Sequence, residues 1–420
     1  MQNYVFVLDT NNEPQPPIHP GEARKLLNAG KAAVYRVYPF TIILKEAKGP
    51  STPDVQLKVD PGSKTTGIAL VQEGKVVWAA ELEHRGQAIK KALTDRRSIR
   101  RGRRNRHTRY RQARFDNRTR PKGWLAPSLK SRVDNLQSWF TKLYKLCPLR
   151  SISMELVRFD MQLMQNAEIS GVEYQQGELQ GYEIREYLLE KWGRKCSYCG
   201  KVDCQLEIEH IIPKSRGGSD RVSNLALACH DCNTKKGTQT AVEFGYPDIQ
   251  KKAKQPQKDA SAVNSVRWAT FNMFKATGLP VEVGTGGRTK FNRCSQNYPK
   301  AHWIDAACVG ASGVMVKLCP DLQPLVIKAT GRGTRQMCRM DKYGFPRTLA
   351  KAAKRVHGFQ TGDLVKAVVP DGKKKGMHVG RVAVRTKGTF RVGSIDGIAY
   401  RHCQLIQRTD GYDYQYVPVQ

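Results

Sequence analysis

The sequence predicts a multidomain α/β protein in which a zinc-binding module interrupts a larger domain built on a sheet. Three observations predict this class: short apolar strands broken by turns at 55–83, a cysteine and histidine cluster at 196–237, and acidic residues at the ends of two strands before that cluster and on a helix after it. At roughly 100 to 200 residues per domain, 420 residues leave room for two to four domains.

The composition is strongly basic. The chain has 71 lysines and arginines against 37 acidic residues, a net charge of +34, and is only 40% hydrophobic. A charge this large indicates a polyanionic partner, and nucleic acid is favoured over a membrane because no amphipathic basic anchor stands out. No apolar run approaches the ~18 residues of a membrane span, and the N-terminus lacks a secretory pattern. We therefore expect a cytoplasmic protein with reduced cysteines.

Residues 1–53 are expected to form a small βαβ-like module without chemistry of its own. Its predicted elements are a strand at 4–8, a proline-rich turn at 14–20, a short helix at 22–27 and a strand at 32–38. From 55 to 83 the pattern changes to three short strands separated by Pro61-Gly62 and Glu73-Gly74, which predicts an antiparallel meander.

Residues 96–120 hold twelve arginines and a single acid, Asp116. Only Gly102 interrupts the run before Pro121, so a helix about 37 Å long is expected at ~1.5 Å per residue. A solvated linker is the alternative, but the internal position and the choice of arginine over lysine favour nucleic-acid binding, because the guanidinium contacts phosphate in a bidentate way. The candidate contacts are Arg96, Arg97, Arg100, Arg101, Arg103, Arg104, Arg106, Arg109, Arg111 and Arg114.

The rest of the chain alternates helices with short strands. We expect helices at 129–146, 181–192, 263–276 and 303–310, a buried strand at 150–157, a polar linker at 247–262 and a glycine-rich stretch at 284–287. The last hundred residues carry 19 lysines and arginines against 7 aspartates. Their predicted strands, at 363–369, 377–385, 389–393 and 398–407, have the spacing of a small barrel.

Two Cys-x-x-Cys pairs, Cys196 with Cys199 and Cys229 with Cys232, stand 30 residues apart. This spacing lets two thiolates of each pair grip one tetrahedral ion, so the four residues predict a closed structural zinc site. Cys204 lies between the pairs and is expected to be a bystander. The other six cysteines are expected to be small apolar residues.

The segment that includes the second pair reads LEIEHIIPKSRGGSDRVSNLALACHDCNTKKG and has the pattern of an HNH nuclease with a ββα-metal fold. His210 is expected to be the general base that activates water. Glu209 and Asn233 are expected to supply oxygen ligands to one Mg²⁺. Asn224 is expected to tie down the loop, and His230 to face solvent or phosphate. A zinc ribbon with an incidental histidine is the alternative.

A second acidic site is split along the chain. Asp60 ends the first strand of the meander, Glu155 lies near the end of the strand at 150–157, and His302 and Asp305 share one face of a helix because they are three residues apart. An RNase H-like sheet places the ends of its first and fourth strands side by side, with a final helix bringing a third carboxylate. Asp60, Glu155 and Asp305 would then hold two Mg²⁺ ions for hydrolysis of a phosphodiester.

The order of these parts resembles the RuvC and HNH layout of the large CRISPR effector nucleases, and at 420 residues the chain resembles their compact transposon-encoded relatives, the IscB family. The phrases HPGEARKLLNAGKAAVYRVYPFTIILK and GVEYQQGELQGYEIREYLLEKWGRKCSYCG are similar to that family, so the resemblance covers most of residues 1–310. The family's N-terminal Pro-Leu-Met-Pro motif is replaced by Pro14-Gln15-Pro16-Pro17, which leaves the fine contacts of this domain open.

The resemblance implies an RNase H-like RuvC domain in three segments, an inserted HNH domain, and small N-terminal and basic, mostly β C-terminal domains. The implied boundaries are 1–53 (PLMP-type domain), 54–95, 121–170 and 256–320 (RuvC segments), 96–120 (bridge helix), 171–255 (HNH) and 321–420 (guide scaffold and target-adjacent motif). The implied activity is RNA-guided cleavage of double-stranded DNA by a prokaryotic monomer bound to one long structured guide RNA. HNH would cut the guide-paired strand and RuvC, with Asp60, Glu155, His302 and Asp305, the displaced strand.

Two other functions are compatible with parts of the sequence. A protein-only nuclease, such as a resolvase or a homing-type enzyme, would share the active sites but needs neither the arginine helix nor two nuclease centres. A non-catalytic RNA-binding scaffold would need only the basic regions. That function does not explain why Glu209, His210 and Asn233 stand at the catalytic positions of an HNH motif.

Overall fold

The computed structural model of the chain divides into two compact units, each built from separate stretches of sequence. The first contains Met1–Val55, Val77–Leu149 and Leu318–Gln420, and the second Gln56–Val76 and Arg150–Lys317. The structure describes residues 3–49, 54–107, 123–156, 180–254, 260–319, 322–331, 338, 341–343, 345–349 and 353–416. Within these residues no helix is both long and apolar enough to cross a membrane.

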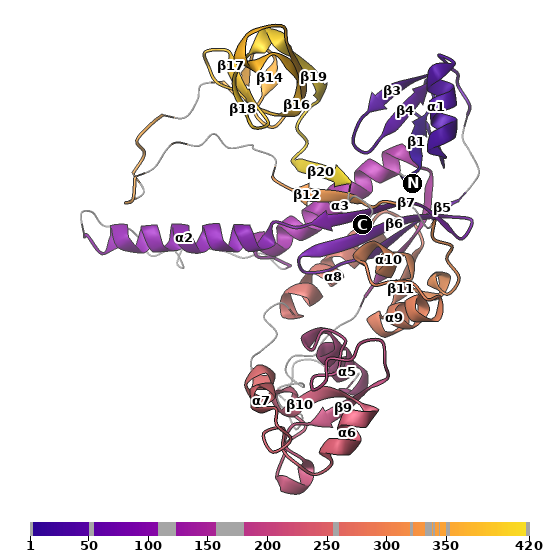
Figure 1. Cartoon of the computed structure of the whole chain (residues 1–420), viewed down its shortest axis with the longest axis vertical. Helices are drawn as coiled ribbons and strands as arrows, with labels where there is room; N and C mark the ends of the chain where they lie inside the picture. Colours follow the sequence, from indigo (N-terminus) through magenta and orange to yellow (C-terminus); the bar gives the residue numbers. More distant parts are fainter. Residues whose placement is uncertain are drawn as a thin grey trace. The chain divides into compact units, whose positions relative to one another are not determined.

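The first unit begins with a four-stranded sheet of order β2-β1-β4-β3 (Figure 1). Its elements are β1 (Val5–Leu8), β2 (Pro14–Ile18), α1 (Pro20–Asn28), β3 (Ala32–Arg36) and β4 (Thr41–Leu44). The strand, helix and strand predicted at 4–8, 22–27 and 32–38 are found as β1, α1 and β3, but the strand parallel to β1 is β4, which the prediction did not include; β3 pairs antiparallel with β4 at the edge. The prediction of a proline-rich turn at 14–20 is wrong, because residues 14–18 form the strand β2. An edge strand tolerates proline, since its outer side needs no N–H donors.

The first unit also contains β12 (Leu325–Ala329), which lies between β7 (Lys75–Glu83) and β20 (Tyr412–Tyr416). Helix α3 (Pro127–Leu146) buries Trp139, whose ring stacks on Trp78 of β7 with centroids 6.3 Å apart. The arginine helix is α2 (Gly86–Arg104), which begins ten residues before the predicted start at 96 and ends at Arg104, so the prediction of a helix to 120 is wrong at 105–107, where His107 has a φ of 50°. The predicted part at 108–120 lies outside the described residues.

The C-terminal part of the first unit is a five-stranded antiparallel sheet of order β18-β17-β16-β15-β19. The strands are β15 (Leu364–Val369), β16 (Gly376–Ala383), β17 (Thr389–Val392), β18 (Ile395–Ala399) and β19 (Cys403–Gln407), preceded by the pair β13 (Arg355–Val356) and β14 (Phe359–Gln360). The prediction of one strand at 398–407 is wrong, because the 3-10 turn at Tyr400–His402 divides it into β18 and β19.

The second unit holds four strands in the order β11-β8-β5-β6. These are β5 (Val55–Asp60), β6 (Thr65–Gln72), β8 (Leu149–Glu155) and β11 (Val281–Gly284), and the accompanying helices are α8 (Ala260–Lys275), α9 (Gly286–Ser295) and α10 (His302–Ala307). The strand predicted at 150–157 and the helices predicted at 263–276 and 303–310 are confirmed within a few residues. Helix α9 was not foreseen.

The zinc-type module of the second unit is an antiparallel hairpin followed by a helix. It consists of α5 (Gln180–Lys191), β9 (Leu206–His210), β10 (Leu225–Cys229), α6 (His230–Lys236) and α7 (Pro247–Lys254). The linker predicted at 247–262 is therefore wrong at 247–254, which form α7, and at 260–262, which begin α8; residues 255–259 lie outside the described residues. Ile249 and Ala253 lie one turn apart and are both buried in the module's core, which stabilises α7 as a helix.

Candidate active sites

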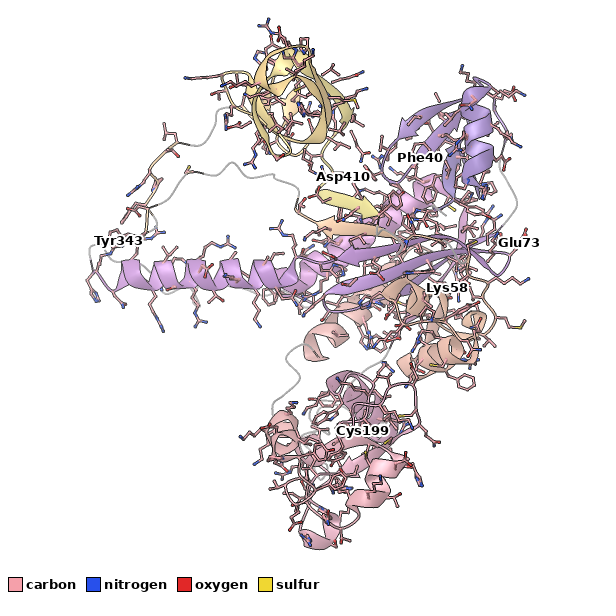
Figure 2. All side chains as sticks on the ribbon, in the orientation of Figure 1. Phe40, Lys58, Glu73, Cys199, Tyr343 and Asp410 are labelled. Carbon is pink, nitrogen blue, oxygen red and sulfur yellow. The ribbon has the colours of Figure 1, made fainter. Side chains whose placement is uncertain are left out.

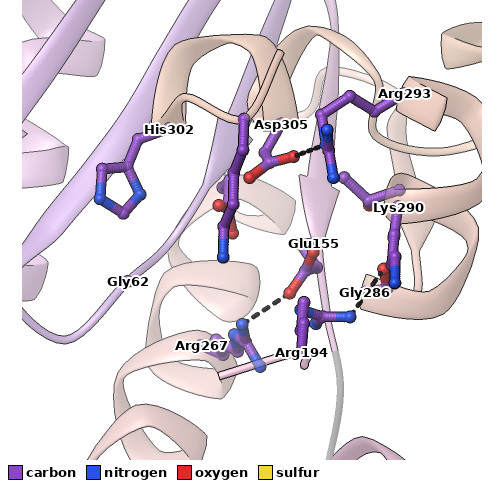
Figure 3. Close-up of a pocket in the computed structure, with 12 residues that line it drawn as sticks. Gly62, Glu155, Arg194, Arg267, Gly286, Lys290, Arg293, His302 and Asp305 are labelled. Atoms are coloured by element: carbon purple, nitrogen blue, oxygen red, sulfur yellow. Dashed lines mark hydrogen bonds and ion pairs between the residues drawn. The ribbon is translucent and has the colours of Figure 1, made fainter. Parts of the chain in front are cut away.

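Three acidic side chains from distant parts of the sequence line one cavity of the second unit (Figure 3). Asp60 is the last residue of β5, Glu155 the last residue of the neighbouring β8, and Asp305 lies on α10. The cavity has a volume of about 180 Å³, and His302 also lines it. The structure thus brings together all four residues that the sequence placed in a split site.

Two arginines that the sequence did not single out hold the acids. Arg267 of α8 donates from Nη2 to Oε1 of Glu155 at 2.6 Å, and both side chains are buried. Arg293 of α9 lies with Nε 3.0 Å from Oδ1 of Asp305. No sequence signal could have found them, since each partner is more than ten residues away along the chain and is set by the tertiary fold.

The cavity is lined by these three acids and by five basic side chains, Arg194, Arg267, Lys290, Arg293 and Lys300. Burial, together with the neighbouring carboxylate of Glu155, holds the pKa of Asp60 well above its usual range, and Asp305 adds to the effect. Burial also raises the pKa of Asp305, against the opposing charge of Arg293. Acids that repel one another in this way gain stability from bound cations, so the donor set fits hard divalent metal ions.

A tight backbone approach positions α10. Gly67 of β6 faces the carbonyl oxygen of His302, and a Cβ atom on Gly67 would lie 1.8 Å from that oxygen. Only glycine allows this distance. The first turn of α10, and with it Asp305, is therefore seated directly on the sheet.

Lys58 anchors the loop that follows α10. Its side chain is fully buried and donates from Nζ to the carbonyl oxygen of Val309 at 2.9 Å and to Oγ of Ser312 at 2.7 Å. Ser312 in turn donates from its backbone to Glu282 of β11 at 3.0 Å. Burial lowers the pKa of Lys58 to about 8, against the attraction of Glu282. Lys58 lies two residues before Asp60, so both side chains are on the same face of β5.

The four predicted zinc ligands converge in the other module. The sulfur atoms of Cys196, Cys199, Cys229 and Cys232 lie within 4.8 Å of one another. Among the described residues, no other group of three or more His, Cys, Asp or Glu side chains has its ligand atoms within this distance. The three acids of the first cavity are therefore spaced more widely than the four cysteines. Cys204 lies outside the group, as expected. Four thiolates at this spacing fit a tetrahedral zinc ion.

Glu209 is buried beside this cluster. The hydroxyl of Tyr198 donates to its Oε2 at 2.5 Å, and Nζ of the fully buried Lys236 pairs with its Oε1. Burial raises the pKa of Tyr198, and the Glu209 carboxylate raises it further, so the hydroxyl remains a donor. Neither Tyr198 nor Lys236 was identified from the sequence.

His210 contacts a carboxylate that sequence reasoning missed. Its Nε2 lies 2.8 Å from Oδ1 of Asp220, and Lys214 donates to the other oxygen of Asp220 at 2.9 Å. Because a carboxylate only accepts, Nε2 carries the proton in the neutral ring and Nδ1 keeps a free lone pair. Asn224 bonds in both directions with the backbone of Ile212 at 2.9 Å, which confirms its role in holding the loop.

A further acid joins this face of the hairpin. Asn233 donates to Oε2 of Glu207 at 2.6 Å, and Nδ1 of the exposed His230 lies 3.1 Å from its Oε1. Within the described contacts, no hydrogen bond joins Asn233 to Glu209. Glu207 and Glu209 are two residues apart on β9 and share one face, so carboxylate and amide oxygens suited to a hard cation gather there. Glu207 could have been found from the sequence, because it stands two residues before Glu209 on the same predicted strand.

The arginine helix is exposed almost throughout, with only Gly86 of α2 buried. Arg103 lies 5.7 Å from the ring centre of Phe345, and Arg106 lies 5.2 Å from the ring centres of both Tyr343 and Phe345. Figure 2 shows Tyr343 near the end of α2. Arg96, Arg97, Arg100, Arg101, Arg103, Arg104 and Arg106 are described, whereas Arg109, Arg111 and Arg114 lie outside the described residues. The positive charge of α2 is therefore largely exposed to solvent.

Comparison with protein families gives two matches. Residues 196–239 match the HNH endonuclease family, so the chain contains an HNH endonuclease domain. Residues 5–177 match the family described as RRXRR protein, and Arg100 to Arg104 read RRGRR. No curated protein matches the chain.

Solved structures with detectable likeness include two of Cas9 from Streptococcus thermophilus, in complex with the AGAA and GGAA PAM. Each is 14% identical, with TM-scores of 0.24 and 0.23, and the match covers 62% and 61% of this chain and 32% of the Cas9 chain. The type II-C Cas9 from Actinomyces naeslundii is 15% identical, with a TM-score of 0.16, over 46% of this chain and 31% of that one. This chain thus spans about a third of their length, and TM-scores this low do not establish a shared fold.

Proposed function

We propose that the protein is an RNA-guided DNA endonuclease with two nuclease centres, of the IscB type that its sequence resembles. One observation carries the proposal: Asp60, Glu155 and Asp305 come from three separate segments and line one cavity, in the same chain as an HNH endonuclease domain. The domain boundaries given from the sequence belong to this proposal, and the RuvC and HNH boundary between 157 and 179 lies outside the described residues.

In the proposed RuvC centre, Asp60, Glu155 and Asp305 hold two magnesium ions. Bound magnesium would supply Lewis-acid polarisation of the scissile phosphate. Arg267 and Arg293 fix the carboxylates of Glu155 and Asp305 and limit their rotation. His302 lines the same cavity, one helical turn from Asp305, where it can contact the reacting phosphodiester.

In the HNH centre, His210 is the proposed general base. Asp220 orients its ring through Nε2, which leaves Nδ1 to take the proton of the attacking water. Glu209 and Asn233 are the proposed magnesium ligands, and Asn224 holds the loop between them. The zinc cluster of Cys196, Cys199, Cys229 and Cys232 is structural in this scheme, because four thiolates leave no open coordination position.

The basic regions are the proposed binding sites for nucleic acid. We assign guide-RNA binding to the exposed arginines of α2, and binding of the RNA scaffold and of a target-adjacent DNA motif to 321–420. Specificity would come from base pairing, and the protein would contact mainly phosphates. A chain of 420 residues cannot enclose a heteroduplex alone, so the RNA supplies much of the architecture.

The test is purification from the native host with sequencing of the bound RNA, followed by cleavage of complementary double-stranded DNA in magnesium. We expect one discrete RNA and two cuts. Asp60→Ala should leave only the guide-paired strand cut, and His210→Ala only the displaced strand. Cleavage of the same DNA by rigorously RNA-free protein would favour a protein-only nuclease, and no cleavage under any condition would favour an RNA-binding scaffold.

A further inference from the structure

We propose that Tyr198 is a positioning residue that couples the zinc cluster to the acid of the HNH centre. The inference rests on the proposed role of Glu209 as a metal ligand. Tyr198 stands between Cys196 and Cys199 in one Cys-x-x-Cys pair, and its hydroxyl ends 2.5 Å from Oε2 of Glu209. The zinc cluster and the catalytic strand are thus joined by one side chain.

The backbone on which Tyr198 sits is fixed on both sides. Zinc would hold Cys196 and Cys199. Ser197, which lies between Cys196 and Tyr198, donates its N–H to the carbonyl oxygen of Leu227 of β10 at 2.7 Å. Gly200 closes the knuckle by donating to the carbonyl oxygen of Cys196 at 3.0 Å. A chain segment held at both ends by one ion has little freedom to change the direction of Tyr198.

The ring is fixed as well. Tyr198 is 7% exposed and packs edge-on against Phe244 and Tyr246, with centroids 5.3 and 5.2 Å away. A tyrosine has two side-chain torsions, and both are set by this packing. The hydroxyl therefore presents its donor to Glu209 in one position.

Glu209 needs this second anchor because its other oxygen pairs with a cation. With Lys236 alone, both carboxylate oxygens could turn towards the ammonium group. The Tyr198 hydroxyl holds Oε2 apart from Lys236, and each carboxylate oxygen keeps a lone pair for a metal ion. Residues that orient a metal ligand in this way typically contribute 10 to 100-fold in metal affinity or activity.

The experiment uses the full chain with its bound RNA and a target labelled on both strands. In Tyr198→Phe we expect the magnesium concentration for half-maximal cutting of the guide-paired strand to rise about 10-fold or more. Zinc content should stay at one ion per chain, and cutting of the displaced strand should not change. Tyr246→Phe is the matched control, since it removes a hydroxyl from the same aromatic cluster and should leave both strands' magnesium dependence unchanged.

A second readout separates this inference from the proposed function. Binding of Mn²⁺ is measured by electron paramagnetic resonance on the RNA-bound Asp60→Ala protein, with and without Tyr198→Phe. Weaker binding in the double variant, with zinc retained, supports the coupling even if no DNA is cut. Unchanged Mn²⁺ affinity and unchanged magnesium dependence in zinc-replete Tyr198→Phe would overturn it. Zinc loss in Tyr198→Phe would also overturn it, because the hydroxyl would then act on the fold of the knuckle.

Discussion

The seating of α10 on β6 leads to a prediction about a residue that makes no contact with substrate. In Gly67→Ala the new Cβ would lie 1.8 Å from the carbonyl oxygen of His302, whereas real Cβ atoms essentially never come within 3.0 Å of such an atom. Helix α10 must therefore move by at least about 1.2 Å. Asp305 lies one turn further along the helix and would move with it.

The size of the effect follows from that displacement. Misplacing a catalytic group by about 1 Å can cost roughly 100-fold in rate, and overpacking typically costs ~1–3 kcal/mol of stability. We expect Gly67→Ala to lower the rate of displaced-strand cleavage about 100-fold. The rate of guide-paired-strand cleavage should stay within about twofold of that of the unsubstituted protein. Single-turnover cleavage of a target labelled on each strand measures both rates.

Ile68→Val is the matched control. Ile68 neighbours Gly67 on β6 and is also buried, and its truncation costs ~0.5–1.5 kcal/mol without pushing on α10. Both rates should stay near those of the unsubstituted protein. A Gly67→Ala protein that cuts the displaced strand within threefold of normal would show that Asp305 does not depend on this contact.

Three further predictions concern the zinc cluster and the buried charges. Cys196→Ser removes one of four thiolates, so we expect loss of the single zinc ion per chain in a colorimetric zinc assay. Asp60 has a raised pKa in the fold, so its ionisation destabilises the metal-free protein as pH rises above about 4. Asp60→Asn should therefore melt at a higher temperature than the parent at pH 7 without added magnesium, and the gain should fade towards pH 4. The pKa of Lys58 is about 8 in the folded protein and 10.5 in the unfolded chain. Between these pH values the unfolded chain binds more protons than the folded protein, so the free energy of unfolding rises with pH. Lys58→Met should weaken that rise in thermal melts from pH 8 to 10. Burial also lowers the pKa of Lys191 to about 8, so Lys191 should keep its own contribution to the rise.

Short-range signals were enough to predict which side chains the structure brings together at the two candidate sites. The two Cys-x-x-Cys pairs fix their own geometry, and Asp60 stands directly before a turn, so the end of its strand could be located without the fold. The same holds for His302 and Asp305, because a spacing of three residues puts both on one helix face whichever sheet the helix contacts.

The residues that support these sites could not be predicted in this way. Arg267 and Arg293 pair with acids that only tertiary packing brings near. Tyr198 resembled an ordinary residue inside a knuckle, and its role depends on the 2.5 Å contact with Glu209. The errors in secondary structure have the same origin, since β2 is tolerated only because it is an edge strand.

The two centres differ in how they hold one of their acids, and this difference has a chemical consequence. In the cavity of Asp60, Glu155 and Asp305, two acids are paired with Arg267 and Arg293, whereas burial and the Glu155 carboxylate raise the pKa of Asp60. In the HNH centre, Glu209 is already paired with Lys236 and with a neutral hydroxyl donor, so its carboxylate is oriented without a metal. A buried pair of this kind costs little further reorganisation when a cation arrives. Glu209, Glu155 and Asp305 should therefore already be oriented in the metal-free protein, whereas Asp60, with its raised pKa, should be stabilised in its charged form only as magnesium binds.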